Sequence, residues 1–263
     1  MNPASIKNSG KVVTFNMDIP QLRAPGRRFW VYLPPGYETS GLRYPVLYMH
    51  DGQNLFDPET SFCGDWGVGK ILDGLCRRKK TRGAIVVGID NGGEKRWDEY
   101  SPWTRADGTG RCKGAGYARF LVEDLKPLID KRYRTLPGRE TTGIAGSSLG
   151  GIISFYAAFK HPEVFSRAGV FSPSFWFARG AAERLVKNAR LPDGLRVYMD
   201  VGTEEGDMKE AYLEDARAMA ELMAAKKGVT LKFVVDEGGL HNEKDWARRF
   251  PAAFLWLFKD AEK

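Results

Sequence analysis

Ser148 is the residue of this chain whose neighbours best suit covalent chemistry. It stands within Gly146-Ser147-Ser148-Leu149-Gly150, after a short apolar run at 142–145 and before a helix-like stretch at 151–158. A G-x-S-x-G sequence at a strand-to-helix corner makes a sharp, strained turn that exposes the serine oxygen beside a helix N-terminus. The two glycines allow strand and helix to cross closely, and they bracket Ser148 rather than Ser147. The alternative is a Gly/Ser loop that only caps a helix.

A serine nucleophile needs a base, and the chain has three histidines. His50 precedes the corner, and His161 stands before Pro162, as is typical of a helix C-terminus. His241 lies in Gly-Gly-Leu-His-Asn between the last strand-like run and the last helical pattern. Because the chain order in α/β hydrolases is serine, acid, histidine, elimination favours His241 as the base. The alternative is an exposed loop histidine.

The acid that orients the base should follow the apolar run at 197–201. Three loop carboxylates are candidates there, Glu204, Glu205 and Asp207. Asp200 still lies within the strand and is expected to point along the sheet, so it is discounted. We predict Glu205 as the acid, with Glu204 and Asp207 as alternatives.

Two backbone N–H groups are needed to stabilise a tetrahedral oxyanion. One belongs to Leu149, the residue after the nucleophile. The other should come from the loop after the third strand, where Gly52 lets the chain turn back, and we assign it to Gln53. A strand followed by a glycine turn would look similar in a protein that is not an enzyme.

The elements that must position these groups follow from hydrophobic patterning. Strand-length apolar runs occur at 29–33, 46–49, 84–89, 143–145, 168–171, 197–201 and 231–235, with a weaker one at 12–15. Helical patterns separate the later runs, and Pro127 predicts a kink in one of them. This order predicts an α/β fold with a mostly parallel sheet covered by helices on both faces. No linker or repeat divides the chain, so residues 1–263 are predicted to form one domain.

Composition excludes several classes of protein. No run of about eighteen apolar residues is present, so no membrane span or membrane partner is expected. The net charge of +7 is scattered and accompanies no nucleic-acid-binding motif. The polar N-terminus lacks the apolar core of a signal peptide, which predicts a cytoplasmic protein. The oligomeric state cannot be read from the sequence.

The cysteines and histidines suggest no metal site. No metal-ligand spacing is present, so no metal is expected. The three cysteines are a sparse, odd set that is typical of a reducing compartment, although a bridge between Cys63 and Cys112 stays open.

Four segments resemble the putative esterase (esterase D-like) family of α/β hydrolases. They are residues 48–57 (YMHDGQNLFD), residues 85–92 (IVVGIDNG), the corner around Ser148, and residues 170–176 (VFSPSFW). The family includes feruloyl and acetyl xylan esterases of carbohydrate esterase family 1 and enterobactin-type siderophore esterases. The resemblance spans residues 20–258 and implies an α/β-hydrolase fold with an eight-stranded sheet, little or no cap domain, and no cofactor.

The resemblance also bears on the site. The family register, counted from Gly202-Thr203, places the acid at Glu205, and some siderophore-cleaving members work with a Ser-His pair alone. The function implied is a serine carboxylic ester hydrolase that acts through an acyl-enzyme on acyl, feruloyl or acetyl esters of sugars or similar small esters. Alternatives are a siderophore esterase, an acyltransferase, and a non-catalytic binding module on the same fold.

Substrate contacts are suggested mainly by aromatic residues. Trp176 follows a strand end, and Trp66 lies in a segment that could wall a groove. Aromatic faces suit sugar or feruloyl rings, so we predict Trp66, Trp176 and the loop carboxylate Asp51 as substrate-binding residues. The long Gly-rich stretch at 92–116 contributes Trp97, Tyr100 and Trp103 as further candidates. For each aromatic taken singly, a core role is the alternative.

Overall fold

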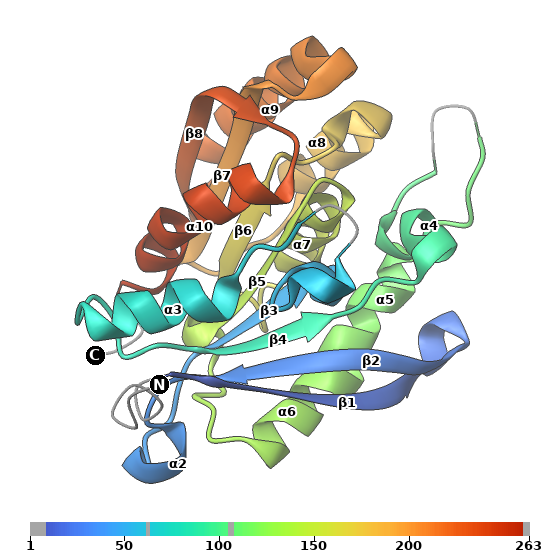
Figure 1. Cartoon of the computed structure of the whole chain (residues 1–263). Coiled ribbons are helices and arrows are strands. Elements are labelled where there is room, and N and C mark those ends of the chain that lie inside the picture. Colours follow the sequence, from blue (N-terminus) through green and yellow to red (C-terminus); the bar gives the residue numbers. More distant parts are fainter. Residues whose placement is uncertain (1–8, 62–63, 105–107, 260–263) are drawn as a thin grey trace.

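The chain forms one eight-stranded sheet with helices on both faces (Figure 1). The computed structural model describes residues 9–61, 64–104 and 108–259. The strands are β1 (Lys11–Ile19), β2 (Ala24–Leu33), β3 (Val46–His50), β4 (Ile85–Ile89), β5 (Thr142–Ser147), β6 (Arg167–Phe171), β7 (Leu195–Glu204) and β8 (Val229–Leu240). The α-helices are α2 (Tyr37–Ser40), α3 (Val68–Arg77), α4 (Arg96–Tyr100), α5 (Gly114–Phe120), α6 (Lys126–Arg132), α7 (Leu149–Lys160), α8 (Arg179–Asn188), α9 (Lys209–Ala224) and α10 (Glu243–Phe258).

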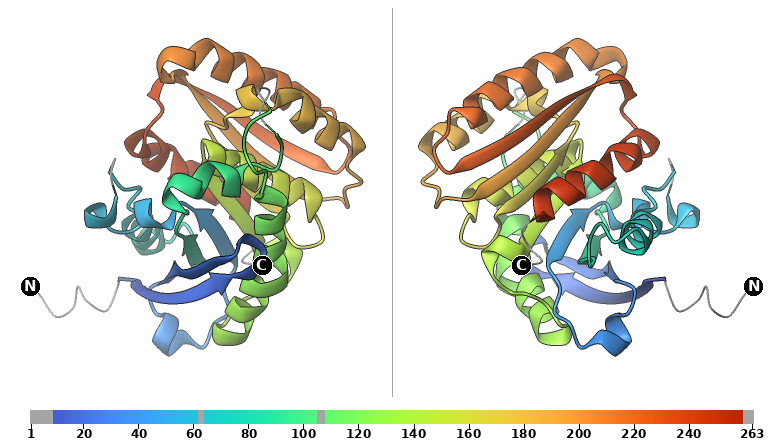
Figure 2. Two further views of the ribbon diagram at one scale, coloured as in Figure 1. Left: turned by 90° about the vertical axis from the view of Figure 1, so that its right-hand side faces the viewer. Right: turned by 90° about the vertical axis from the view of Figure 1, so that its left-hand side faces the viewer.

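The strand order is β1-β2-β4-β3-β5-β6-β7-β8. The hairpin β1–β2 is antiparallel and joins the rest through an antiparallel β2–β4 pair, whereas every other pair is parallel. The side views show this hairpin at one end of the sheet and β8 at the other (Figure 2). All eight predicted strands are present, and the predicted mostly parallel α/β sheet is confirmed.

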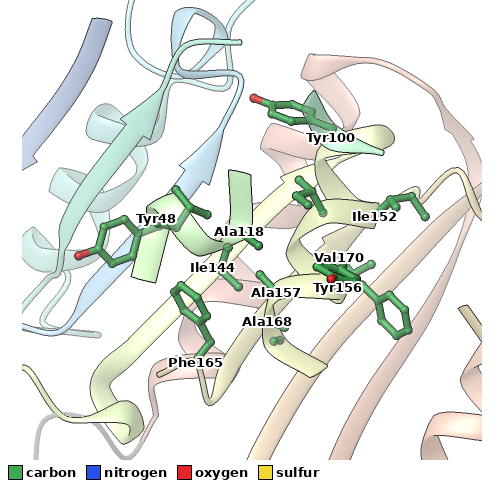
Figure 3. Close-up of a cluster of buried hydrophobic side chains, with 14 of the residues drawn as sticks. Tyr48, Tyr100, Ala118, Ile144, Ile152, Tyr156, Ala157, Phe165, Ala168 and Val170 are labelled. Atoms are coloured by element: carbon green, nitrogen blue, oxygen red, sulfur yellow. The ribbon is translucent and has the colours of Figure 1, made fainter. Parts of the chain in front are cut away.

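The central strands are buried on both faces, so their side chains alternate between two cores. On β3, Val46 and Tyr48 join the core beneath α5 to α9, while Leu47 and Met49 join the core beneath α3 and α10. Figure 3 shows part of the larger core, where Tyr48, Ile144 and Phe165 pack with Ala157 of α7. This double burial explains why the strands read as continuous apolar runs.

The helix around Pro127 is interrupted, as its sequence predicts. Residues Leu121–Leu125 form a π-helical turn between α5 and α6, in which the Lys126 N–H bonds the Leu121 carbonyl. Proline has no N–H to offer the carbonyl four residues earlier, so the backbone adjusts just before it.

The parallel arrangement brings five chain segments to one edge of the sheet. The segments that follow β3, β5, β6, β7 and β8 all leave from strand carboxyl ends, and these strands are consecutive neighbours. Ligands of open α/β sheets bind at this edge. Within the described part of the chain, no helix is both long and apolar enough to cross a membrane.

Candidate active site

Ser148 occupies a strained corner between β5 and α7. Its φ of 59° and ψ of −122° lie outside the regions that L-residues favour. The corner is also tight, because a Cβ on Gly146 would lie 2.8 Å from the carbonyl carbon of Gly150. The Ser148 N–H donates to the Phe171 carbonyl at 2.9 Å, which ties the corner to the end of β6. Strain held in place by neighbours in this way is typical of functional sites.

The residues predicted as acid and base are in direct contact. Glu205 follows β7 and is 4% exposed, whereas His241 follows β8 and is half-buried. The Nδ1 atom of His241 is hydrogen-bonded to Oε2 of Glu205. A carboxylate in this position selects one imidazole tautomer and stabilises the imidazolium.

The alternative carboxylates point elsewhere. Glu204 is exposed and pairs with Lys209 at 2.9 Å, and Asp207 is exposed. Asp200 is fully buried, and its Oδ1 accepts the Ser172 N–H at 3.2 Å. Burial raises the pKa of Asp200 to about 7, against the opposing effect of the Arg249 guanidinium. Among the candidates that the sequence offers, Glu205 is therefore the one that contacts His241.

The nucleophile candidate has a partner that the sequence analysis did not predict. Ser148 Oγ lies 3.2 Å from Ser174 Oγ, which in turn lies 2.9 Å from the Tyr212 hydroxyl. The centroid of the Tyr212 ring lies 4.9 Å from that of the His241 ring, so Tyr212 contacts both Ser174 and His241. Among the described residues, Ser148 Oγ makes no hydrogen bond to His241. Catalytic hydrogen bonds of this kind often tighten only when substrate binds.

The predicted N–H donors occupy the starts of two helical turns. The first helical bond of α7 runs from the Ile152 N–H to the Ser148 carbonyl, and that of the turn Gly52–Asn54 runs from the Asn54 N–H to the Asp51 carbonyl. Leu149 comes before Ile152, and Gln53 comes before Asn54, the first residues whose N–H groups bond within their turns. The N–H groups of Leu149 and Gln53 therefore have no acceptor inside the helical turn. A Cβ on Gly150 would lie 3.2 Å from Asp51 Oδ2, which shows that the two turns touch.

Asp51 is held inside the protein. It is 6% exposed and has a φ of 57°. Its carboxylate accepts two bonds from Arg96, at 2.7 and 2.8 Å, and one from Asn91 Nδ2 at 2.6 Å. Although burial acts to raise it, the pKa of Asp51 is lowered by Arg96 and Asn91. The carboxylate thus anchors the Gln53 turn, and its predicted contact with substrate stays a prediction.

The two predicted tryptophans have different surroundings. Trp66 is 4% exposed and packs against Phe171 and Trp246, with ring centroids 5.0 and 5.9 Å apart. It lies in the core beneath α3 and α10, which is the alternative that the sequence offered, and its predicted contact with substrate stays a prediction. Trp176 is half-buried, in the turn Phe175–Phe177, with its ring 5.8 Å from that of Trp97.

The remaining aromatic and histidine candidates lie in the core or at a helix end. Tyr100 is fully buried, and Trp103 packs against Tyr156 at 5.8 Å. His161 follows the C-terminus of α7, and its Nδ1 lies 3.4 Å from the exposed Glu163. The open question of a Cys63–Cys112 bridge falls on Cys63, which lies outside the described residues.

His50 is buried below the site. It is 1% exposed, and its Nδ1 lies 3.0 Å from the Tyr117 hydroxyl. Burial lowers the pKa of His50 to about 3, so the ring is neutral at physiological pH. Within residues 9–61, 64–104 and 108–259, no three His, Cys, Asp or Glu side chains cluster as metal ligands would.

Comparison with known proteins assigns the family. The family described as Putative esterase matches residues 25–257, nearly the whole chain. The chain belongs to this esterase family. The esterase is 29% identical to the uncharacterized protein YbbA of Bacillus subtilis over 247 residues, which cover 90% of this chain and 94% of YbbA.

Two relatives of the esterase carry names that describe an activity. It is 26% identical to an endo-1,4-beta-xylanase/feruloyl esterase of Xylanibacter ruminicola, covering 87% of this chain and 29% of that protein. It is also 26% identical to the ferri-bacillibactin esterase BesA of Bacillus subtilis, covering 75% of this chain and 73% of BesA.

A solved structure has the same fold. An IroE-like serine hydrolase from Shewanella oneidensis superposes with a TM-score of 0.79 at 20% identity, covering 95% of this chain and 81% of that one. The predicted α/β-hydrolase fold of the esterase is thereby confirmed.

Proposed function

We propose that this esterase is a serine carboxylic ester hydrolase that works through an acyl-enzyme within a single domain. The observation that carries the proposal is the contact of buried Glu205 with His241 at the sheet edge where the strained Ser148 corner lies. In this proposal Ser148 is the nucleophile, His241 the base and Glu205 the acid that orients it.

The reaction follows from these roles. Ser148 Oγ attacks the ester carbonyl carbon while its proton passes to Nε2 of His241. The Gln53 and Leu149 N–H groups stabilise the oxyanion. When the tetrahedral intermediate collapses, His241 gives its proton to the leaving alcohol and the acyl group stays on Ser148. Water, deprotonated by His241, then attacks the acyl-enzyme and releases the acid.

The proposed substrates are acyl, feruloyl or acetyl esters of sugars, or similar small esters. A relative named as a feruloyl esterase supports this class, as does the half-buried pair Trp97 and Trp176, whose faces suit planar or sugar rings. Because BesA is named as an esterase of ferri-bacillibactin, a siderophore ester is the second candidate.

The test compares two neighbouring serines. Ser148→Ala should lower kcat for p-nitrophenyl acetate about a million-fold and abolish labelling by a fluorophosphonate. Ser147→Ala is the matched control, because Ser147 is the last residue of β5 and is buried beside the nucleophile. The proposal fails if Ser147→Ala is the inactive variant or if Ser148→Ala hydrolyses the ester normally. A panel of feruloyl esters, acetylated xylan and a catecholate siderophore then identifies the substrate class.

A further inference from the structure

Ser172 is a fully buried serine directly behind the site, at the end of β6. Its φ of 40° lies in the left-handed region, which serine rarely adopts. Its N–H donates to Asp200, to the carbonyl at 3.0 Å and to Oδ1 at 3.2 Å. The backbone of Ser172 is therefore held in an unusual conformation that sets where its hydroxyl lies.

The hydroxyl of Ser172 has three partners. Nε1 of Trp246 lies at 2.9 Å, Nη2 of Arg249 at 3.1 Å and Oε1 of Glu205 at 2.7 Å. Indole and guanidinium nitrogens only donate, so together they occupy both lone pairs of the hydroxyl oxygen. The single hydroxyl proton is left for Glu205, which accepts it.

The hydrogen bond from Ser172 decides which oxygen of Glu205 is left to contact His241. Oε1 accepts the Ser172 hydroxyl and also the Gly202 N–H at 2.6 Å. Oε2 is the oxygen that meets Nδ1 of His241. An ionised carboxylate can only accept, so Nδ1 carries the proton and the lone pair of the imidazole is on Nε2.

Arg249 is itself fixed in place. It is 5% exposed, its Nε lies 3.0 Å from Asp200 Oδ2 and its Nη1 lies 2.7 Å from Asp236 Oδ2. Because Asp200 and Asp236 lie against two of its nitrogens, the guanidinium directs the third, Nη2, toward Ser172. A planar guanidinium fork provides this directionality, which a lysine would not.

We propose that Ser172 is a positioning residue of the esterase site, anchored by Arg249 and Trp246, which holds Glu205 so that Oε2 faces His241. This inference rests on the proposed function, because it acts through Glu205 as the acid of the triad. Ser172 does not contact Ser148 or His241 itself. Its contact with Glu205 is direct, whereas Trp246, which donates to Ser172, also packs its ring 4.9 Å from that of His241, so the test must separate these two routes.

The test is a double-mutant cycle on kcat. Ser172→Ala should lower kcat about ten- to a hundredfold, the range for loss of a hydrogen bond to a charged group, and leave KM within about threefold. In the Glu205→Gln background the same substitution should lower kcat no further, because the carboxylate that Ser172 positions is no longer there.

The matched control is Ser166→Ala, at the opposite end of β6. Ser166 is equally buried, donates to the Arg139 carbonyl at 2.5 Å and accepts from Arg167 Nη1 at 3.2 Å. It resembles Ser172 in burial and in having both a donor and an acceptor as partners, but its partners lie away from the site, so kcat should stay near the parent value.

Two outcomes overturn the inference while the proposed function stands: Ser172→Ala leaves kcat within threefold of the parent, or its effect multiplies with that of Glu205→Gln. If Glu205→Gln itself is harmless, the assigned acid and this inference fall together. Should Ser172→Ala not fold, Arg249→Lys takes its place in the cycle, with the same expectation and the same contradicting results.

Discussion

Replacing Glu205 with glutamine tests the proposed acid in a way that the structure makes quantitative. The amide keeps the shape of the carboxylate but has one acceptor oxygen and one donor nitrogen. Ser172 and Gly202 both donate to the Oε1 position, so the amide oxygen must stay there. The reverse orientation would cost two hydrogen bonds, roughly 1–3 kcal/mol each.

With its oxygen fixed, the introduced glutamine side chain would present its NH2 group to Nδ1 of His241. Nδ1 must then accept, so the imidazole proton moves to Nε2, the atom that should receive the Ser148 proton. The same tautomer error in a serine protease costs about 10⁴-fold in kcat. We expect a similar loss here, equivalent to about 5.5 kcal/mol of transition-state stabilisation, with little change in KM.

The assay is steady-state hydrolysis of p-nitrophenyl acetate by Glu205→Gln, Glu204→Gln and Asp207→Asn. The last two are controls because both side chains are exposed, and the Glu204–Lys209 pair at the surface contributes little. Their kcat should stay within a few-fold of the parent. A Glu205→Gln variant that keeps kcat within tenfold would refute the tautomer argument and favour a Ser-His pair or an acid from elsewhere.

Three further expectations concern stability and cofactors. Asp51→Asn should lower the free energy of unfolding in urea by about 2–3 kcal/mol, because it leaves the half-buried Arg96 without its ion pair; a variant as stable as the parent would contradict this. Burial lowers the pKa of His50 to about 3, against about 6.5 when unfolded, so its stabilising contribution is complete above pH 6.5 and is lost as the pH falls toward 3. Between pH 7 and 4.5 the parent should lose about 2–3 kcal/mol more stability than His50→Gln, and equal losses would show that His50 is not the cause. Hydrolysis should survive EDTA, since no step of the proposed reaction uses a metal, and inactivation by the chelator would argue against it.

The central strands could be predicted from the sequence because burial on both faces gives each of them a continuous apolar run. Their order could not, since hydrophobic runs do not show that β4 lies between β2 and β3. Ser148 could be predicted because a glycine-bracketed turn is a local pattern. His241 could be predicted because the chain has only three histidines.

The surrounding contacts were beyond sequence reasoning. Ser172 and Ser174 stand two residues apart in the segment 170–176, and the sequence does not show that Ser172 bonds Glu205 while Ser174 lies beside Ser148. Tyr212 fits the apolar face of α9, which hides its hydroxyl contact with Ser174. For Trp66 the sequence left a groove wall and a core position open, because an aromatic in a loop-like segment does not reveal which way its ring points.

The contact of Gly150 with the Asp51 turn limits how this enzyme could be re-engineered. A methyl group at position 150 would meet Asp51 Oδ2 at 3.2 Å and His50 Cβ at 3.3 Å, and one at position 146 would meet the Gly150 backbone. A side chain at either position would therefore displace the neighbouring backbone or the Asp51 turn, and a library that varies these positions would need compensating changes on both chain segments. Trp97 and Trp176 are half-buried and pack against each other, so a search for new acyl or alcohol preference would begin with changes at this pair rather than at the glycines.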